Sequence, residues 1–142
     1  LAAQVAASVA AGARVVCGGR APARRGFFYE PTALVDVAPD SPALAEELFG
    51  PVAAMMTFDT DAEALRRANA TRYGLGASVW TADAERGRRL AVGLEVGSVF
   101  VNGLVQSDPR LPFGGVKDSG FGRELGREGL RAFAAAKTIW VR

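Results

Sequence analysis

Hydrophobic and polar residues alternate in blocks along the chain, and the spacing within each block predicts its secondary structure. Four segments have the spacing or the composition of helices: Leu1–Ala11, Asp61–Asn69, Asp83–Leu94 and a stretch from beyond Gly122 to about Ala135. Six short apolar runs predict strands: Arg14–Cys17, Thr32–Val37, Pro51–Phe58, Gly76–Thr81, Ser98–Asn102 and Thr138–Val141. Strands that alternate with helices predict an α/β fold, with a mostly parallel sheet and flanking helices.

Local signals refine this prediction. Thr60 and Glu63 have the spacing of a capping box, which places the start of a helix at Asp61. Ser98–Asn102 is an uninterrupted apolar run, typical of a strand that is buried on both faces of a parallel sheet. A turn or a helix start is expected at Pro39–Pro42, and a long glycine-rich loop at Gly103–Gly122. The chain contains no internal repeat and no long linker, so one domain with a terminal strand is expected.

Composition excludes several classes of function. The 142 residues include 49% hydrophobic and 23% charged residues, which suffices for a buried core. The basic residues are scattered, whereas nucleic-acid binding requires a basic patch, and no apolar run approaches the roughly 18 residues of a membrane span. The absence of histidine excludes a Ser-His-Asp triad and any histidine metal site within this chain, and we expect no bound metal.

The single cysteine, Cys17, allows no internal disulfide, which favours a reducing compartment and a cytoplasmic location. Cys17 ends an apolar strand among small residues and has no histidine to deprotonate it. We therefore expect a buried, inert thiol and not a nucleophile.

Three short segments carry candidate chemistry. Phe28–Thr32 is an aromatic turn before a strand, and the simplest interpretation is a packed entry to the sheet. Glu46–Pro51, with the sequence Glu-Glu-Leu-Phe-Gly-Pro, offers carboxylates for ribose hydroxyls and a ring that could pack beside a nicotinamide. The alternative is a solvated helix end that is stopped by proline.

The third segment, Pro112–Glu124, is rich in glycine and could cradle a phosphate with main-chain N–H groups. It fits neither the P-loop pattern, because Phe121 follows Gly120, nor the dinucleotide fingerprint, because Leu125 stands where a glycine is required. The alternative is a loop that uses glycine to bend sharply beside another chain segment.

Taken together, these segments resemble the aldehyde dehydrogenase superfamily in order and spacing, from roughly Gly12 to Arg142. Tyr73-Gly74-Leu75, the strand that ends at Asn102 and the closing Lys137-Thr138 add to this resemblance. It implies that residues 1–136 are the C-terminal part of the catalytic domain and that residues 137–142 hold an oligomerisation strand. It is most similar to the succinate-semialdehyde dehydrogenase type.

The resemblance also implies roles for single residues. Glu47 matches a carboxylate that binds the ribose next to the nicotinamide of NAD or NADP, and Phe49 matches the ring beside that nicotinamide. Phe113 matches an aromatic wall of the aldehyde pocket, and Val105 and Ser107 lie on the loop that corresponds to the lining of the substrate tunnel. Arg110 is open to a second substrate contact or to a structural role.

The family's catalytic cysteine and glutamate match no residue of this chain and are expected before Leu1. We therefore expect that the chain contains no catalytic residue and is inactive by itself. The full-length protein is expected to be a homo-oligomeric enzyme that oxidises a small aldehyde. One alternative is a non-catalytic remnant that pairs with full-length subunits through its terminal strand. A free-standing phosphate-binding module at Gly114–Gly122 is the other.

Overall fold

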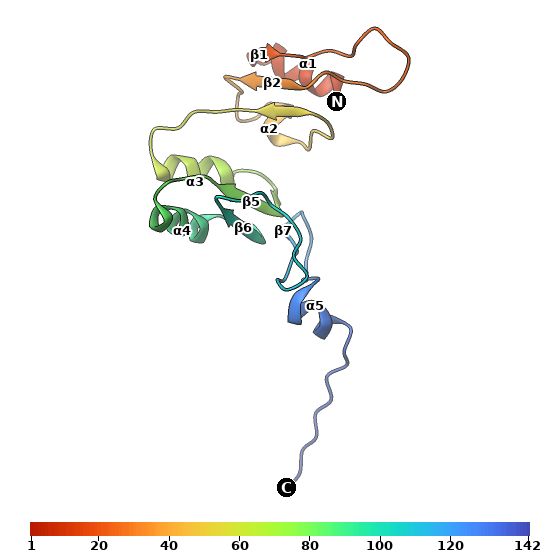
Figure 1. Ribbon diagram of the computed structural model, residues 1–142, viewed down its shortest axis with the longest axis vertical. Coiled ribbons are helices and arrows are strands. Elements are labelled where there is room, and N and C mark those ends of the chain that lie inside the picture. Colours follow the sequence, from red (N-terminus) through yellow and green to blue (C-terminus); the bar gives the residue numbers. More distant parts are fainter. The chain divides into compact units, whose positions relative to one another are not determined.

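The computed structural model describes all 142 residues and has an α/β fold. The chain forms two compact units, Leu1–Arg67 and Ala68–Arg142. The sequence pattern predicts one domain over this range. Figure 1 gives the element labels used below.

The first unit is built on a three-stranded sheet in the order β1-β2-β3. Its elements are α1 (Ala2–Ala10), β1 (Arg14–Cys17), β2 (Thr32–Val35), α2 (Pro42–Ala45), β3 (Val52–Ala54) and the greater part of α3 (Asp61–Asn69). Strands β1 and β2 are antiparallel, and β2 and β3 are parallel, with Thr32 opposite Val52. The core consists of five buried apolar residues: Val5, Ala13, Leu34, Val37 and Ala43.

A hydroxyl group connects α1 to α2. Ser8 is fully buried, and its Oγ donates to the main-chain oxygen of Gln4 at 2.8 Å and accepts from the main-chain N–H of Ala43 at 2.9 Å. Pro42 is the first residue of α2 and has no N–H, so Ala43 supplies the first donor of that helix. Ser41, at the N-cap, makes no side-chain cap bond. Ser8 therefore caps α2 from a different helix.

The second unit contains two short two-stranded sheets. Its elements are β4 (Tyr73–Gly74), β5 (Gly76–Val79), α4 (Ala84–Gly93), β6 (Ser98–Val101), β7 (Val116–Lys117) and α5 (Gly126–Ala132). Strands β5 and β6 pair in parallel, with Gly76 opposite Ser98, and β4 and β7 pair antiparallel. The side chain of Asp83 caps α4 by accepting from the N–H of Arg86.

Lys117 joins three segments of the second unit. Its Nζ donates to the main-chain oxygens of Asn69 at 2.8 Å and Thr71 at 3.3 Å, and pairs with Glu95 Oε2 at 2.9 Å. The amide of Asn69 donates to the main-chain oxygen of Gly93 at 2.8 Å and accepts from the N–H of Glu95 at 2.9 Å. The C-terminal ends of α3 and α4 are thereby tied to β7.

Most of the predicted elements are present, and the differences are local. The helix Asp61–Asn69 has the predicted bounds, and Thr60 Oγ1 accepts from the N–H of Glu63, but Glu63 Oε2 accepts from Asp59 and not from Thr60. The predicted strand Pro51–Phe58 is reduced to β3, and two short strands, β4 and β7, were not predicted. Thr138–Val141 forms no strand within this chain.

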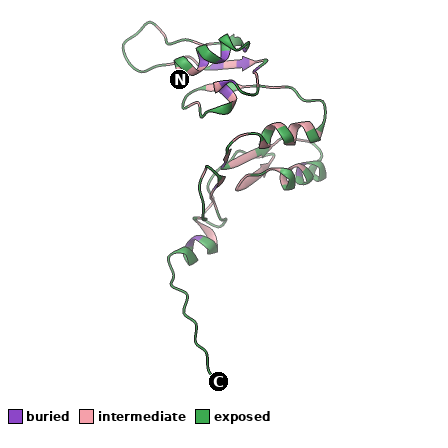
Figure 2. Cartoon of the chain, turned by 180° about the vertical axis from the view of Figure 1, so that it is seen from behind, coloured by how far each residue is buried: buried purple, intermediate pink, exposed green.

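Much apolar surface remains uncovered. Trp80, Val92, Phe121 and sixteen other large apolar side chains are exposed besides Phe49, whereas the buried positions in Figure 2 gather mainly in α1, β2 and α2. The prediction that Cys17 is buried is wrong, because all four residues of β1 are exposed and no element of this chain covers them. Strand β6 is half-buried and not buried on both faces, because its sheet has only two strands.

The aromatic turn is packed only in part. Tyr29 packs against the core, whereas Phe27 and Phe28 are exposed, and the guanidinium of Arg24 lies 3.7 Å from the centre of the Phe28 ring.

None of the helices combines the length and the apolar composition that a bilayer crossing requires.

We expect Lys117→Met to lower the free energy of unfolding of the second unit by about 1–3 kcal/mol, because the main-chain oxygens of Asn69 and Thr71 and the Glu95 carboxylate lose a charged donor. The measurement is the urea midpoint followed by tryptophan fluorescence. Lys137→Met is the matched control, since Lys137 is exposed and its loss should change stability by less than about 0.5 kcal/mol. Equal midpoints for the two variants would contradict the role given to Lys117.

Candidate functional site

Glu47 and Phe49 lie in the first unit, on the segment between α2 and β3. The Glu47 side chain is exposed and makes no hydrogen bond or ion pair within the chain, so both carboxylate oxygens are free to accept. The Phe49 ring is 88% exposed. Leu48, between them, packs against the core. Side chains along the segment alternate between exposed and packed positions. Leu48 therefore anchors the segment, and both candidate cofactor residues stay uncovered.

The backbone of this segment is held by the preceding elements. Gln4 Nε2 donates to Glu46 Oε2 at 2.8 Å and to the main-chain oxygen of Glu47 at 3.2 Å. The main-chain oxygen of Pro51 accepts from the N–H of Thr32 at 2.8 Å as the chain enters β3. The side chain of Leu1 packs against Gly50, where a Cβ atom would force it to shift.

The substrate candidates lie in the second unit, where a cavity of about 430 Å³ opens beside β6. Strand β6 supplies one wall, and the loop that follows it supplies the other. The lining residues are Ser98, Val99, Phe100, Val101, Gln106, Asp108, Leu111, Pro112 and Phe113. Of the three predicted substrate residues, Phe113 lines this cavity.

Val105 and Ser107 lie on the same loop but do not line the cavity. The Val105 side chain faces Gly76 at the start of β5, and Ser107 is exposed between two lining residues. These neighbours, Gln106 and Asp108, are polar groups that the sequence analysis did not identify. An irregular loop has no periodicity, so only their position next to Ser107 could have pointed to them.

Asp108 and Arg110 form an ion pair at this cavity. The Arg110 guanidinium contacts both carboxylate oxygens, with NH2 at 2.5 Å from Oδ2 and Nε at 2.9 Å from Oδ1, and the Arg110 N–H donates to Oδ1 at 2.9 Å. These hydrogen bonds, led by that of the side chain, lower the pKa of Asp108 to about 2. The same pairing raises the pKa of Arg110. In this structure Arg110 has a structural role in the loop.

The glycine-rich segment bends beside other parts of the second unit, as one of the two interpretations predicted. Phe113 and Glu124 exchange main-chain hydrogen bonds of 2.8 Å in both directions, which closes the segment on itself. A Cβ atom at Gly97 would overlap the carbonyl oxygen of Gly114. Ser119 Oγ accepts from the N–H of Gly74 at 3.0 Å. These contacts set the position of Phe113 at the cavity wall.

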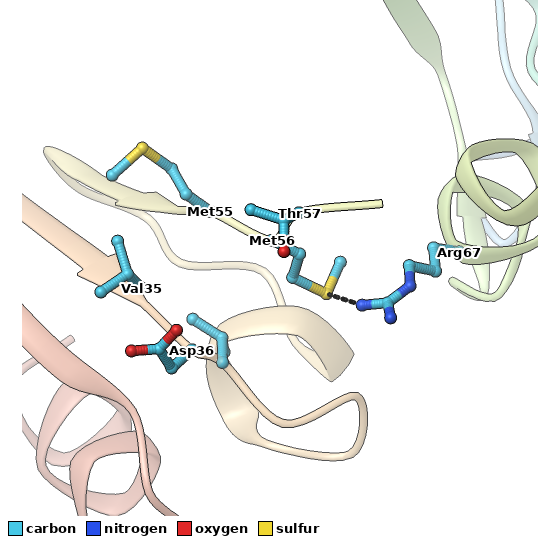
Figure 3. Close-up of a pocket in the computed structure, with 7 residues that line it drawn as sticks. Val35, Asp36, Met55, Met56, Thr57 and Arg67 are labelled. Carbon is cyan, nitrogen blue, oxygen red and sulfur yellow. Dashed lines mark hydrogen bonds between the residues drawn. The ribbon is translucent and has the colours of Figure 1, made fainter. Parts of the chain in front are cut away.

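The first unit also has an open cavity, of about 520 Å³, beside β2 and β3 (Figure 3). Its lining residues are Val35, Asp36, Val37, Met55, Met56, Thr57 and Arg67. Arg67 donates to Met56 Sδ at 3.6 Å and pairs with Glu63 at 2.6 Å. Neither Glu47 nor Phe49 lines this cavity, so it is not part of the candidate cofactor site.

The sequence profile described as "Aldehyde dehydrogenase family" matches residues 1–139. The chain belongs to the aldehyde dehydrogenase family. Its fold agrees with this assignment, since it superimposes with a TM-score of 0.93 on the NAD+ complex structure of an aldehyde dehydrogenase from Bacillus cereus. The two are 38% identical, and the match covers 99% of this chain and 28% of that one.

Two relatives within the family bear the name of the same activity. A Synechocystis sp. protein named as a probable succinate-semialdehyde dehydrogenase [NADP(+)] is 52% identical over 98% of this chain and 31% of its own length. A succinate-semialdehyde dehydrogenase [NADP(+)] of Mycobacterium avium is 48% identical over 99% of this chain and 30% of its own length. The chain thus spans about 30% of the aldehyde dehydrogenases that it matches.

We expect Arg110→Gln to raise the pKa of Asp108 from about 2 toward its ordinary value near 3.8, because the strongest hydrogen bond to the carboxylate is lost. The pKa is read from the carboxyl ¹³C shift of Asp108 in an NMR titration. Arg131→Gln, which removes an exposed arginine of α5, is the control and should leave that pKa unchanged. The same Asp108 pKa in both variants would show that Arg110 does not hold the carboxylate.

Proposed function

We propose that this chain is the C-terminal part of an NAD(P)-dependent aldehyde dehydrogenase that oxidises succinate semialdehyde to the carboxylic acid. The observation that supports this most directly is the similarity, at 52% and 48% identity over nearly the whole chain, to relatives that bear that name. Both of those names specify NADP, and the Bacillus cereus structure holds NAD+, so either dinucleotide is the proposed cofactor.

The residues of the first unit fit a dinucleotide. Glu47 has two free carboxylate oxygens, which is what two ribose hydroxyls require of an acceptor. Phe49 presents an uncovered ring of the kind that packs beside a planar nicotinamide. When bound, the dinucleotide supplies the hydride acceptor, and the role of these two residues is to orient it.

The second unit supplies the substrate side. Phe113 forms an aromatic wall of the cavity beside β6, which suits the hydrocarbon part of a short aldehyde. Ser107 and Val105 remain the proposed contacts on the tunnel loop, with Ser107 donating a hydroxyl hydrogen bond to the far carboxylate of the substrate. A site that hydrogen-bonds this carboxylate discriminates strongly against aldehydes without one.

The reaction also needs a nucleophile, which we propose is a cysteine outside residues 1–142, with a glutamate there as the base. Cys17 does not serve, because its Sγ donates its hydrogen bond to the main-chain oxygen of Pro31 at 3.8 Å and the chain has no histidine to deprotonate it. The chain alone is accordingly inactive. The large exposed apolar surface is consistent with a segment that the rest of an enzyme covers.

The C-terminal segment supports a second part of the proposal. Ile139, Trp140 and Val141 are 77%, 83% and 86% exposed, and the segment has no strand partner within the chain. An unpaired apolar segment of this kind completes its hydrogen bonds by adding to the sheet of another copy. The proposed assembly is a cytoplasmic homo-oligomer. If the chain is a remnant, the same segment would attach it to full-length subunits.

We expect the intact enzyme that contains this segment to reduce NADP or NAD with succinate semialdehyde. Glu47→Gln should slow single-turnover formation of the reduced dinucleotide by roughly 10- to 100-fold, because a weaker acceptor leaves the nicotinamide less well oriented. Stopped-flow absorbance at the reduced nicotinamide band measures this rate.

Asp40→Asn is the control for Glu47→Gln, since it neutralises an exposed carboxylate of the same unit that also has no partner. Its single-turnover rate should match that of the unchanged enzyme. A Glu47→Gln enzyme with an unaltered rate would refute the role proposed for Glu47. An intact enzyme that oxidises no aldehyde with either dinucleotide would refute the proposed function.

We expect Trp140→Asp in the intact enzyme to lower the assembly mass, because a charge in the apolar segment opposes its burial between subunits. Size-exclusion chromatography with light scattering gives the mass. Ala136→Asp adds the same single negative charge at an exposed residue before residues 137–142 and should leave the mass unchanged. An undiminished mass for Trp140→Asp would mean that the subunits associate through other surfaces.

A further inference from the structure

One face of α1 contacts the segment that contains Glu47. Leu1, Gln4, Val5 and Ser8 recur at helical spacing on this face, and the other α1 side chains are exposed. Leu1 contacts Gly50, and Val5 belongs to the core. Elements α1 and α2 belong to the same compact unit (Figure 1).

We infer that Gln4 is a positioning residue for the dinucleotide, because its amide fixes the backbone of Glu47 while leaving the Glu47 carboxylate free. This inference rests on the proposed function of Glu47. Gln4 Nε2 reaches both Glu46 Oε2 and the main-chain oxygen of Glu47, at 2.8 and 3.2 Å. A primary amide has two N–H donors, so one group can make both bonds at once.

These two bonds give the neighbouring carboxylates different roles. The Glu46 carboxylate is occupied as an acceptor from Gln4, whereas the Glu47 carboxylate has no partner. Rotation of the segment about its backbone would exchange the two carboxylates. Gln4 opposes this rotation by binding Glu46 through its side chain and Glu47 through its main chain.

Ser8 supports the same arrangement one turn further along α1. Its hydroxyl caps α2 at Ala43, and α2 ends at Ala45, directly before Glu46. The same hydroxyl donates to the main-chain oxygen of Gln4. The start of the segment is therefore fixed by Ser8, and the position of Glu47 by Gln4.

The test uses Gln4→Met in the intact enzyme, since methionine has a similar length and cannot make either hydrogen bond. We expect the KM for the dinucleotide to rise about 5- to 10-fold, an effect typical of one lost hydrogen bond to a binding group. The KM for the aldehyde should stay within about twofold, because the side-chain hydrogen bonds of Gln4 lie within the first unit, on the segment of the cofactor candidates.

A second readout does not depend on activity. Hydrogen–deuterium exchange of the peptide that spans Glu46–Val52, measured without dinucleotide, should be faster in Gln4→Met. The double variant Gln4→Glu with Glu46→Gln exchanges the donor and the acceptor of the side-chain bond and should restore slow exchange in part. Gln4→Glu alone places two carboxylates together and should be at least as fast as Gln4→Met.

The possible outcomes separate the two proposals. Unchanged exchange in Gln4→Met overturns the positioning role, whether or not the enzyme is active. Faster exchange with an unchanged dinucleotide KM overturns the link to the cofactor and leaves Gln4 only a stabilising contact. An unsubstituted enzyme without dehydrogenase activity refutes the proposed function, and the exchange measurement then decides the positioning role of Gln4 alone.

Discussion

The hydroxyl of Ser8 is the contact on which the first unit depends. Helix α2 has only four residues, too few to be stable without tertiary support, and it begins with a proline. Its first free N–H, on Ala43, would be buried without a partner if Ser8 did not accept from it, and such a group costs about 1–3 kcal/mol. Because the segment with Glu47 starts where α2 ends, its conformation is set by a helix that lies far earlier in the sequence.

Few elements of this chain pack over its apolar residues, and this explains its narrow sheets and its exposed side chains. The chain buries five apolar residues and leaves twenty large ones exposed, so its sheets stay narrow. The exposure of Cys17 and the partial burial of β6 have this one cause. The chain spans about 30% of the length of the relatives that it matches, and under the proposed function the rest of the enzyme would cover these residues.

Sequence reasoning succeeded where the structural signal is local. The capping pattern of Thr60 and Glu63 predicted the start of α3 at Asp61, and the glycine and proline after Phe49 placed that segment between a helix and a strand. Strands β4 and β7 have two residues each, too short for periodicity. They are held by distant contacts: Gly74 of β4 donates to Ser119 Oγ, and Lys117 of β7 donates to the main-chain oxygen of Asn69. For the site, the position of Phe113 at a cavity could be expected. The cavity contacts of Gln106 and Asp108 could not, because they depend on the path of an irregular loop.

The charge at that cavity bears on the proposed substrate. Asp108 lines the cavity and stays ionised down to a pH of about 2, so a lone carboxylate there would repel the carboxylate of succinate semialdehyde. Arg110 contacts both oxygens of Asp108, and the pair has no net charge. The arginine that holds the loop in shape therefore also removes the repulsion, although its guanidinium is not free to bind the substrate. Under the proposed function, recognition of the anionic aldehyde on this side falls to neutral donors: the amide of Gln106, which lines the cavity, and the hydroxyl of Ser107, which is exposed beside it.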